Sequence, residues 1–274
     1  MTYRKFWQPL TARYDEGEAK AITRMVAEVR FGLSHADVLA GRMETVSEQE
    51  LKPLQERLLA GEPVQYVLGQ AQFFGRWFHV EPGVLIPRSE TEELCQHILE
   101  DARINPCASI LDIGTGSGCI AITLAAELPQ ASIMAWDISE KALAIAHRNA
   151  QQVHEVSFRL VDALCPPMGD SDYWDIIVSN PPYVCEEEKD QMEPHVLEHE
   201  PHEALFVPDD DPLLFYRSIG HYSLHALKPG GRLFFELNAR YAQETATLLR
   251  GMGFQSVDII KDQYGKDRFI KTCK

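Results

Sequence analysis

The sequence has no hydrophobic run long enough to cross a membrane. Among its 274 residues, no apolar stretch approaches the roughly 20 residues that a transmembrane helix needs. The first residues, Met1 to Pro9, also lack the uninterrupted apolar core of a signal peptide. We therefore expect a cytoplasmic protein with no membrane partner.

Cysteines are few, and none of them are spaced as metal ligands. No two have a C-x2-C or C-x4-C spacing, and most lie within apolar segments. We therefore expect no metal site and no disulfide framework, and we interpret the cysteines as small core residues. The six are Cys95, Cys107, Cys119, Cys165, Cys185 and Cys273.

Positive charge is also scarce. The chain has 26 Lys and Arg against 41 Asp and Glu, a formal net charge of −15, and it contains no Lys/Arg-rich stretch. Tight nucleic-acid binding depends on clustered cations that neutralise phosphates. The charge balance therefore disfavours direct nucleic-acid binding and favours a neutral or basic protein as the partner.

Apolar residues recur at helical spacing through the first part of the chain. Within 18–34 they predict a helix for which Gly32 is the expected stop. The pair Ser47 and Glu50 has the spacing of a capping box at the start of another helix. We predict a helical domain over residues 1–70. Its apolar stripes are typical of a bundle that packs on itself, and a small domain of this kind also often holds the substrate of an enzyme.

The sequence changes character between residues 71 and 88. Aromatic and β-branched residues are interrupted there by Gly75 and by the pair Pro82-Gly83. This pattern predicts a β-hairpin that links the helical domain to the rest of the chain.

Strand and helix patterns alternate from residue 89 to residue 274. Short buried strands that alternate with helices predict an α/β fold with a Rossmann-like, seven-stranded, mostly parallel sheet. In such a sheet, ligands bind at the carboxyl ends of the strands. The predicted strands are 109–113, 132–136, 156–160, 174–179, 232–237, 256–261 and 268–271, with helices ending near 128 and 250 and others over 139–151 and 212–227.

A glycine-rich loop, Asp-Ile-Gly-Thr-Gly-Ser-Gly, follows the first of these strands. Alternate glycines allow a tight turn and bring a ligand close to main-chain N–H groups at the start of a helix. The third glycine comes one residue earlier than in the dinucleotide pattern G-x-G-x-x-G. The loop therefore favours S-adenosyl-L-methionine over a dinucleotide, and over a plain strand–helix turn. We predict cofactor contacts from Asp112, Gly114, Thr115, Gly116, Ser117 and Gly118, with Asp112 near the methionine part.

Two further acids stand at predicted strand ends. Asp137 follows Asp112 by 25 residues and can accept both ribose hydroxyls of the cofactor. Asp162 can accept from the adenine amino group, while the backbone N–H of Ala163 meets a ring nitrogen. Taken alone, Asp137 could be a helix cap and Asp162 could open a turn. Next to the glycine-rich loop, we predict that these residues bind the cofactor.

The sequence Asn180-Pro181-Pro182-Tyr183 is the most specific feature of the chain, and it follows the predicted strand 174–179. The two prolines remove two N–H donors and stiffen the loop. The side-chain oxygen of Asn180 and the carbonyl oxygen of Pro181 can then accept both hydrogens of a planar NH2 group. Tyr183 can pack its ring against that group and near a positive sulfonium. We predict that these four residues are catalytic and bind the substrate, and that Asn180 also contacts the cofactor.

The expected chemistry follows from the low nucleophilicity of an amide nitrogen, whose lone pair is delocalised into the carbonyl. The site must hold the NH2 group in line with the methyl group and polarise it. A dedicated base is not required if the proton leaves after methyl transfer, and the sequence offers no candidate for one.

These motifs resemble those of the peptide chain release factor glutamine methyltransferases, and the resemblance spans nearly the full chain. The family's DxGTGSG loop corresponds to Asp112–Gly118, its strand-end acid to Asp137, and its NPPY motif to Asn180–Tyr183. The segments Gly61–Gly69 and Val84–Glu92 also resemble segments of that family.

The resemblance implies a class I methyltransferase fold with S-adenosyl-L-methionine as cofactor. It implies methylation at N5 of the glutamine in the GGQ motif of class 1 release factors, with residues 1–70 gripping the factor. Pro87–Glu92 would wall the cofactor site, and we expect Arg88 and Glu90 to bind substrate. We expect a monomer. The chain departs from the family pattern at Ser89, Ala163, Asp209–Asp211 and Leu237-Asn238, the last two in substrate-side loops.

Three alternatives remain open. An adenine amino-group methyltransferase acting on nucleic acid uses the same NPPY geometry, but it needs a basic surface and usually base flipping. A glutamine methyltransferase that modifies a ribosomal protein differs only in its substrate. A nucleotide-dependent oxidoreductase or a cofactor-binding scaffold conflicts with the glycine spacing and with NPPY.

Overall fold

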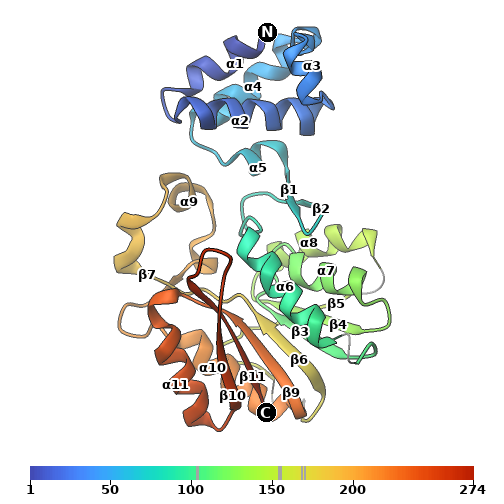
Figure 1. Ribbon diagram of the computed structural model, residues 1–274, viewed down its shortest axis with the longest axis vertical. Helices are drawn as coiled ribbons and strands as arrows, with labels where there is room; N and C mark the ends of the chain where they lie inside the picture. Colours follow the sequence, from blue (N-terminus) through green and yellow to red (C-terminus); the bar gives the residue numbers. More distant parts are fainter. Residues whose placement is uncertain (103–104, 154–155, 168, 170) are drawn as a thin grey trace. The chain divides into compact units, whose positions relative to one another are not determined.

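The computed structural model divides the chain into two compact units, each described here by itself (Figure 1). Among the residues that the structure describes, no helix is both long and apolar enough to cross a membrane. The described residues are 1–102, 105–153, 156–167, 169 and 171–274. The first unit contains Met1–Ala71, Val80–Pro82 and Met192–His199, and the second contains Gln72–His79, Gly83–Gln191 and Glu200–Lys274.

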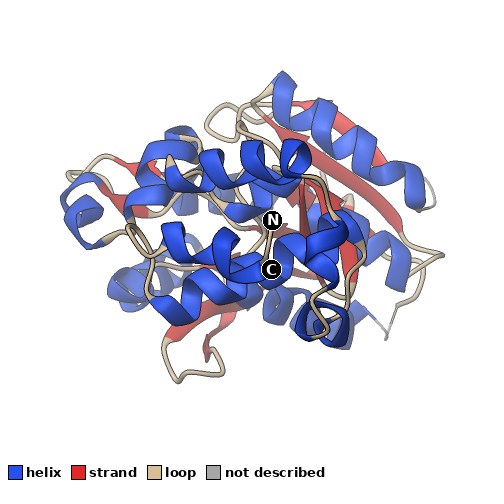
Figure 2. Cartoon of the chain, turned by 90° about the horizontal axis from the view of Figure 1, so that it is seen from above, coloured by secondary structure: helices blue, strands red, loops and turns tan. Residues whose placement is uncertain are grey.

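The first unit is helical, and its helices, drawn in blue with all other helices of the chain in Figure 2, enclose a small apolar core. Phe6, Leu10 and Leu51 are fully buried there. The predicted capping box is only half formed: Ser47 accepts from the backbone N–H of Glu50 at 3.3 Å and caps α4, but the Glu50 carboxylate accepts from the Ser47 hydroxyl at 2.7 Å instead of from the Ser47 backbone N–H. The helices are α1 (Tyr3–Leu10), α2 (Glu16–Met25), α3 (His35–Leu39), α4 (Glu48–Leu59), α5 (Val64–Leu68) and α9 (Pro194–His199), with 3-10 turn η2 (Arg42–Thr45).

The helix predicted within 18–34, with Gly32 as its stop, is confirmed: the chain is helical as far as Phe31, and Gly32 has φ 65°, although the second half is π-helical. The α-helix α2 ends at Met25, and a π-helical turn, η1 (Val26–Arg30), follows it. Ser34 does not belong to this helix, because its side chain caps the start of α3 by accepting from the backbone N–H of Asp37. A capping side chain competes for the backbone and begins a new helix, a signal that apolar periodicity alone does not contain.

A hairpin of two short strands, β1 (Gln70–Phe73) and β2 (Arg76–His79), follows α5. Its turn needs positive φ at both Phe74 (49°) and Gly75 (73°). Gly75 adopts that conformation without steric cost, which explains the glycine at this position.

The second unit is built on a seven-stranded sheet of order β10-β11-β9-β6-β3-β4-β5. The pairs from β9 to β5 are parallel, and β11 is antiparallel to both of its neighbours. The predicted mostly parallel α/β sheet is therefore confirmed. The strands are β3 (Ser109–Ile113), β4 (Ser132–Asp137), β5 (Val156–Leu160), β6 (Trp174–Ser179), β9 (Leu227–Glu236), β10 (Gln255–Lys261) and β11 (Asp267–Cys273).

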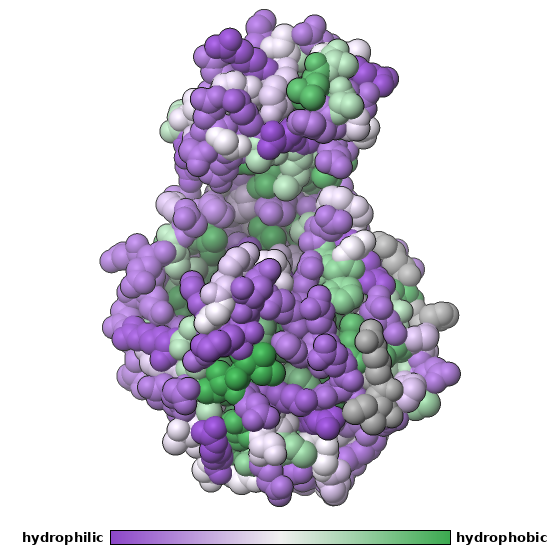
Figure 3. Space-filling view, in the orientation of Figure 1, coloured by the Kyte–Doolittle hydropathy of each residue, from purple (hydrophilic) through white to green (hydrophobic). Residues whose placement is uncertain are grey.

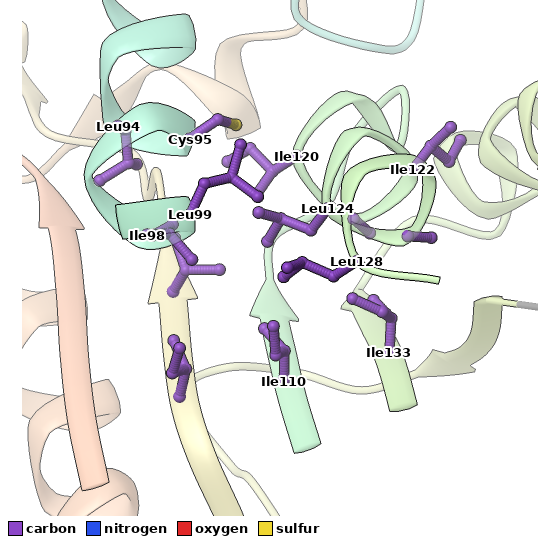
Figure 4. Packing of buried hydrophobic residues seen from close by; sticks show 14 of the residues in the cluster. Leu94, Cys95, Ile98, Leu99, Ile110, Ile120, Ile122, Leu124, Leu128 and Ile133 are labelled. Atoms are coloured by element: carbon purple, nitrogen blue, oxygen red, sulfur yellow. The ribbon is translucent and has the colours of Figure 1, made fainter. Parts of the chain in front are cut away.

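Helices cover both faces of this sheet, and each face has its own apolar core. Figure 4 shows one face, where Ile98 and Leu99 of α6 point toward α7, whose Leu124 lies above Ile110 of β3. Burial of such side chains supplies most of the stabilisation, at about 25 cal/mol per Å² of apolar area. The helices are α6 (Ser89–Ala102), α7 (Cys119–Glu127) and α8 (Glu140–Asn149), with α10 (Leu214–Ala226) and α11 (Ala242–Met252) contributing to the other core.

Shorter elements connect these layers. A two-residue strand, β7 (Val184–Cys185), directly follows the NPPY motif and pairs in parallel with β8 (Phe206–Val207). The remaining turns of 3-10 helix are η3 (Ala150–Gln152), η4 (Glu186–Gln191), η5 (His202–Ala204) and η6 (Ala239–Tyr241).

Two expectations need correction in this unit. The sequence patterns did not indicate α6, whose acidic first turn is followed by buried residues such as Leu94. The interpretation of all cysteines as core residues is wrong for Cys107 and Cys165, which are exposed, although Cys95 and Cys119 are buried free thiols. Cys107 and Cys165 lie in turns that border strands, where burial is not imposed by the sheet.

Candidate active site

A cavity of about 270 Å³ opens at the carboxyl ends of β3, β4 and β6. This is the place where a parallel sheet binds ligands, because loops diverge there. Most of the predicted site residues line it: Arg88, Gly114, Thr115, Gly116, Ser117, Asp137, Asp162, Ala163, Asn180, Pro181 and Pro182. The predicted site residues outside this lining are Glu90, Asp112, Gly118 and Tyr183.

The glycine-rich loop turns back over the end of β4. The backbone N–H groups of Gly114 and Thr115 both donate to the carbonyl of Trp136 at 2.9 Å. Gly114 has φ 77°, and a Cβ built at that position would meet no atom within 4 Å, so its backbone is open to a ligand. Gly118 also has positive φ, but a Cβ there would lie 2.7 Å from Cδ1 of Ile122. Gly118 therefore serves the close packing of α7 rather than the cavity.

Asp112 is fully buried beneath this loop. Its Oδ2 accepts from the hydroxyl of Thr115 at 2.6 Å and from the backbone N–H of Ala121 at 3.3 Å. Its Oδ1 has no hydrogen-bond partner among the described residues. Burial raises the pKa of Asp112 to about 7. The carboxylate thus holds the loop to α7, and the contact with the methionine part of the cofactor stays a prediction.

Asp137 ends β4 and faces the cavity. Its Oδ2 accepts from the backbone N–H of Gly116 at 2.8 Å, and its Oδ1 accepts from the N–H of Ser139 at 2.9 Å. Burial raises the pKa of Asp137, and the negative charge of Glu203 adds to the effect. A carboxylate has about four acceptor sites, so two remain for a pair of vicinal hydroxyls such as those of ribose.

The Asp162–Leu164 turn forms the next part of the wall. Asp162 accepts from the N–H of Leu164 at 2.8 Å through Oδ1, and the carbonyl of Ala163 accepts from Ser218 at 2.6 Å. Ile138 and Leu164 line the same cavity although both are substantially exposed. Flat apolar walls next to a polar acceptor suit the adenine ring of a nucleoside.

The NPPY motif leaves the sheet at the end of β6, where the hydroxyl of buried Ser179 donates to the carbonyl of Ile113 at 2.7 Å. Pro181 and Pro182 line the cavity. The Nδ2 of Asn180 donates to the hydroxyl oxygen of Thr91 at 3.3 Å. The Asn180 side-chain oxygen is therefore directed away from Thr91, as an acceptor for a ligand must be.

Tyr183 is held by two contacts outside the lining. Its hydroxyl donates to Oε1 of Glu236 at 3.0 Å, and its carbonyl accepts from Nδ2 of Asn238 at 3.0 Å. Burial, together with the charge of Glu236, raises the pKa of Tyr183 well above its usual range. The phenol is therefore a hydrogen-bond donor with no role as a base, and its predicted contact with a planar NH2 group stays a prediction.

Arg88 and Glu90 differ in their placement. Arg88 forms an ion pair of 2.6 Å with Glu200, whose side chain is fully buried and whose other oxygen accepts from the N–H of Ile86 at 3.1 Å. Glu90 accepts from the neighbouring hydroxyl of Ser89. Arg88 lines the cavity while held by Glu200, and Glu90 lies outside the lining, so the substrate contacts expected of both stay predictions.

Three residues of this site escaped the sequence analysis, namely Thr91, Glu200 and Glu236. Glu236 could have been predicted as a site residue, because it is a carboxylate at the carboxyl end of a strand next to β6. Thr91 lies inside the Pro87–Glu92 segment, but no local pattern indicates that its hydroxyl turns inward. Glu200 is one of many acids in its segment and had no distinguishing signal.

Taken together, the fold and this cavity define a class I, S-adenosyl-L-methionine-dependent methyltransferase. The sheet has the required order and polarity, the glycine-rich loop exposes its backbone, and acids stand at the ends of successive strands. Comparison with known proteins agrees. Residues 5–69 match the family described as PrmC N-terminal domain, and residues 87–205 match the Methyltransferase small domain.

Two curated relatives specify the family. The chain is 45% identical over 268 residues to the release factor glutamine methyltransferase of Bacteroides thetaiotaomicron, covering 96% of this chain and 95% of the relative. It is 42% identical over 275 residues to the protein of that name from Flavobacterium psychrophilum, covering 98% and 96%. The chain belongs to the release factor glutamine methyltransferase family.

A solved structure supports the fold alone. The methyltransferase from Pyrococcus furiosus is similar with a TM-score of 0.54 and 17% identity, covering 81% of this chain and 98% of that one.

Proposed function

We propose that this chain transfers the methyl group of S-adenosyl-L-methionine to the side-chain amide nitrogen, N5, of the glutamine in the GGQ motif of class 1 peptide chain release factors. The bond between carbon and the sulfonium sulfur breaks, a bond between carbon and the amide nitrogen forms, and the nitrogen releases one proton to solvent. Monomeric action in the cytoplasm, without direct nucleic-acid binding, belongs to the same proposal.

The observation that carries the proposal is the environment of Asn180. Its Nδ2 is engaged by Thr91, so its oxygen is left as an acceptor beside the glycine-rich loop. An acceptor pair from Asn180 and Pro181 suits a planar NH2 group, which donates two hydrogens. The names of the curated relatives favour a release-factor glutamine as the carrier of that group.

Residue roles follow within this proposal. Asp137 would hold the ribose of the cofactor, and Asp162 with Ala163 the adenine. Thr115, Ser117 and the glycines would cradle the methionine part, with Asp112 below them. Residues 1–70, the proposed substrate-holding domain, would grip the release factor, with residues 71–88 as linker and 89–274 as catalytic domain.

The test is methyl transfer from isotope-labelled S-adenosyl-L-methionine to a purified release factor. We expect label in the factor and none in a variant whose GGQ glutamine is replaced by alanine. Labelling of the variant at the native rate would contradict the proposal. Preferential labelling of DNA or RNA would favour the adenine amino group as the acceptor, and preferential labelling of a ribosomal protein would favour that substrate.

A further inference from the structure

A buried carboxylate stands directly behind the NPPY motif. Glu236 ends β9, which is paired in parallel with β6, so that Phe235 lies beside Ser179, the residue before the NPPY motif. Glu236 is only 2% exposed. Its Oε2 accepts from the hydroxyl of Thr91 at 2.7 Å, and its Oε1 accepts from the hydroxyl of Tyr183 at 3.0 Å. This carboxylate therefore joins α6 to the last residue of the NPPY motif, and Thr91 of α6 in turn accepts from the first residue, Asn180.

With Glu236 ionised, proton counting fixes the direction of the hydrogen bonds. An ionised carboxylate has no hydrogen to donate, and a threonine hydroxyl has one. Because Thr91 donates its hydrogen to Glu236, its oxygen can only accept from Asn180. The side chain of Asn180 has its hydrogens on Nδ2, which lies 3.3 Å from that oxygen. The amide of Asn180 must therefore present nitrogen to Thr91 and oxygen to the other side.

Burial of a carboxylate is costly, which argues against a role in packing alone. Desolvation raises the pKa of Glu236, whereas the hydroxyls of Thr91 and Tyr183 and the positive charge of Arg268 lower it. Replacement of such a buried group by an apolar residue is often neutral or stabilising. A buried carboxylate that accepts from two hydroxyls therefore points to a role in their orientation.

We propose that Thr91 and Glu236 are positioning residues that set the orientation of the Asn180 amide, and that Glu236 also fixes the phenol of Tyr183. The inference rests on the proposed function, because it explains how Asn180 offers an acceptor to a substrate NH2 group. A flipped amide would present two donors to that group and repel it. Neither Thr91 nor Glu236 acts on the reacting atoms in this scheme.

The first arm of the test observes the Asn180 amide without a release factor. The 15N-labelled protein gives a side-chain NH2 signal for Asn180, assigned by its loss in Asn180→Asp. We expect Thr91→Val, which keeps the shape and removes the hydroxyl, to shift this signal and to speed its hydrogen exchange. Thr91→Ser should keep both near the native values. An unchanged signal in Thr91→Val would overturn the inference whatever the substrate is.

The second arm measures turnover. We expect Thr91→Val to lower kcat about 10- to 100-fold, because a small misplacement of a positioning group has an effect of that size. The Kd for S-adenosyl-L-methionine should change little, and Thr91→Ser should restore most of kcat. A matched control is Thr245→Val, which removes a buried hydroxyl in α11 that donates to the carbonyl of Tyr241. It should leave kcat unchanged.

The role of Glu236 is tested by Glu236→Gln, alone and combined with Thr91→Val. The carboxylate of Glu236 accepts through both oxygens, whereas the substituted amide accepts through its oxygen and donates through its nitrogen. The substitution therefore disturbs the hydroxyl that faces the nitrogen. If Glu236 acts on Asn180 through Thr91, the double variant should lose less kcat than the product of the two single losses. A loss of kcat in the double variant equal to the product of the two single losses would overturn the proposed action of Glu236 through Thr91.

The outcomes separate this inference from the proposed function. An altered Asn180 signal with a native kcat in Thr91→Val would overturn the inference. An altered signal in a protein whose wild type does not methylate release factors would refute the proposed substrate but support the positioning role for another NH2 group.

Discussion

At the scale of single residues, we propose that cofactor binding depends chiefly on Asp137 and substrate orientation on Asn180. Asn180 and Asp137 both line the cavity, but Asn180 is bonded to Thr91 whereas Asp137 is bonded to the loop through Gly116. The two can therefore be separated by mutation.

The first prediction is a reciprocal pair of variants. Asn180→Ala should lower kcat by at least about 100-fold, because removal of one preorganised polar group has an effect of that order, and should leave the Kd of the cofactor within a few-fold of native. Asp137→Ala should raise the Kd and KM for the cofactor more than it lowers kcat. Steady-state kinetics and calorimetry measure both. A near-native kcat in Asn180→Ala would contradict its role as acceptor.

The second prediction concerns Asp112 and pH. Its pKa is about 7 in the folded state against 3.8 for an unperturbed carboxyl, so the folded state binds the proton more tightly. Stability from this group is fully present below about pH 4 and is lost as pH rises to about 7. Asp112→Asn keeps an acceptor for Thr115 without the charge. The Tm of wild type minus that of Asp112→Asn should therefore fall between pH 5 and about 7 and then level off.

Asp211, whose pKa is shifted in the opposite direction, provides the control for this measurement. The hydrogen bond and charge of Arg217 lower the pKa of Asp211 below 3.8. The Tm difference between wild type and Asp211→Asn should therefore stay flat from pH 5 upward, within about a degree. A flat difference for Asp112→Asn as well would show that its carboxyl does not titrate in this range.

At the scale of elements, the sequence predicted the sheet well because buried strands have a local signature. The ranges 109–113, 156–160 and 174–179 coincide with β3, β5 and β6. A short apolar run, as in β3 and β6, or an alternation of apolar and polar residues, as in β5, is sufficient for such strands. The polar loops at the carboxyl ends of these strands could also be predicted as ligand-binding loops, because ligands bind at that edge of a parallel sheet.

Contacts between distant segments could not be predicted in this way. Thr91 and Glu236 are separated by 145 positions, and Arg88 and Glu200 by 112. In neither pair does the local sequence around one residue indicate its partner. Tyr183 is an example. Its motif predicts that the ring faces the substrate, but nothing local predicts that its hydroxyl donates to Glu236.

The third prediction belongs to this scale and concerns the wall segment that contains Ile86 and Arg88. Glu200 holds it by accepting from the N–H of Ile86 and from the Arg88 guanidinium. In Glu200→Gln the amide nitrogen must face one of these donors, which leaves a buried donor unpaired. We expect a loss of about 1–3 kcal/mol in the free energy of unfolding and a several-fold weaker cofactor Kd.

Chemical denaturation and calorimetry with S-adenosyl-L-methionine check this result. The matched control is Glu127→Gln, which breaks the ion pair with Arg76 at 2.6 Å on the surface. A surface pair of this kind contributes about 0–1 kcal/mol, so both the stability and the Kd should be nearly native. Equal effects of the two substitutions would mean that Glu200 does not hold the wall.

At the scale of the whole molecule, charge is the dominant feature. The formal net charge is −15, and the face of the sheet-containing unit seen in Figure 3 is largely hydrophilic. A field of this sign speeds encounter with a basic partner and opposes a polyanion. This property bears on the choice between a protein and a nucleic acid as substrate, which the NPPY motif alone does not decide.

The fourth prediction follows from this field. Salt screens long-range attraction, with a Debye length of about 10 Å at 0.1 M. If the partner presents positive charge near its glutamine, its KM should rise several-fold between about 50 and about 400 mM NaCl, while kcat changes little. A nonionic osmolyte at equal osmolality serves as the control, and it should leave KM unchanged. A KM that falls with salt would mean that the two surfaces repel each other, and the acidic surface would then oppose recognition of the substrate.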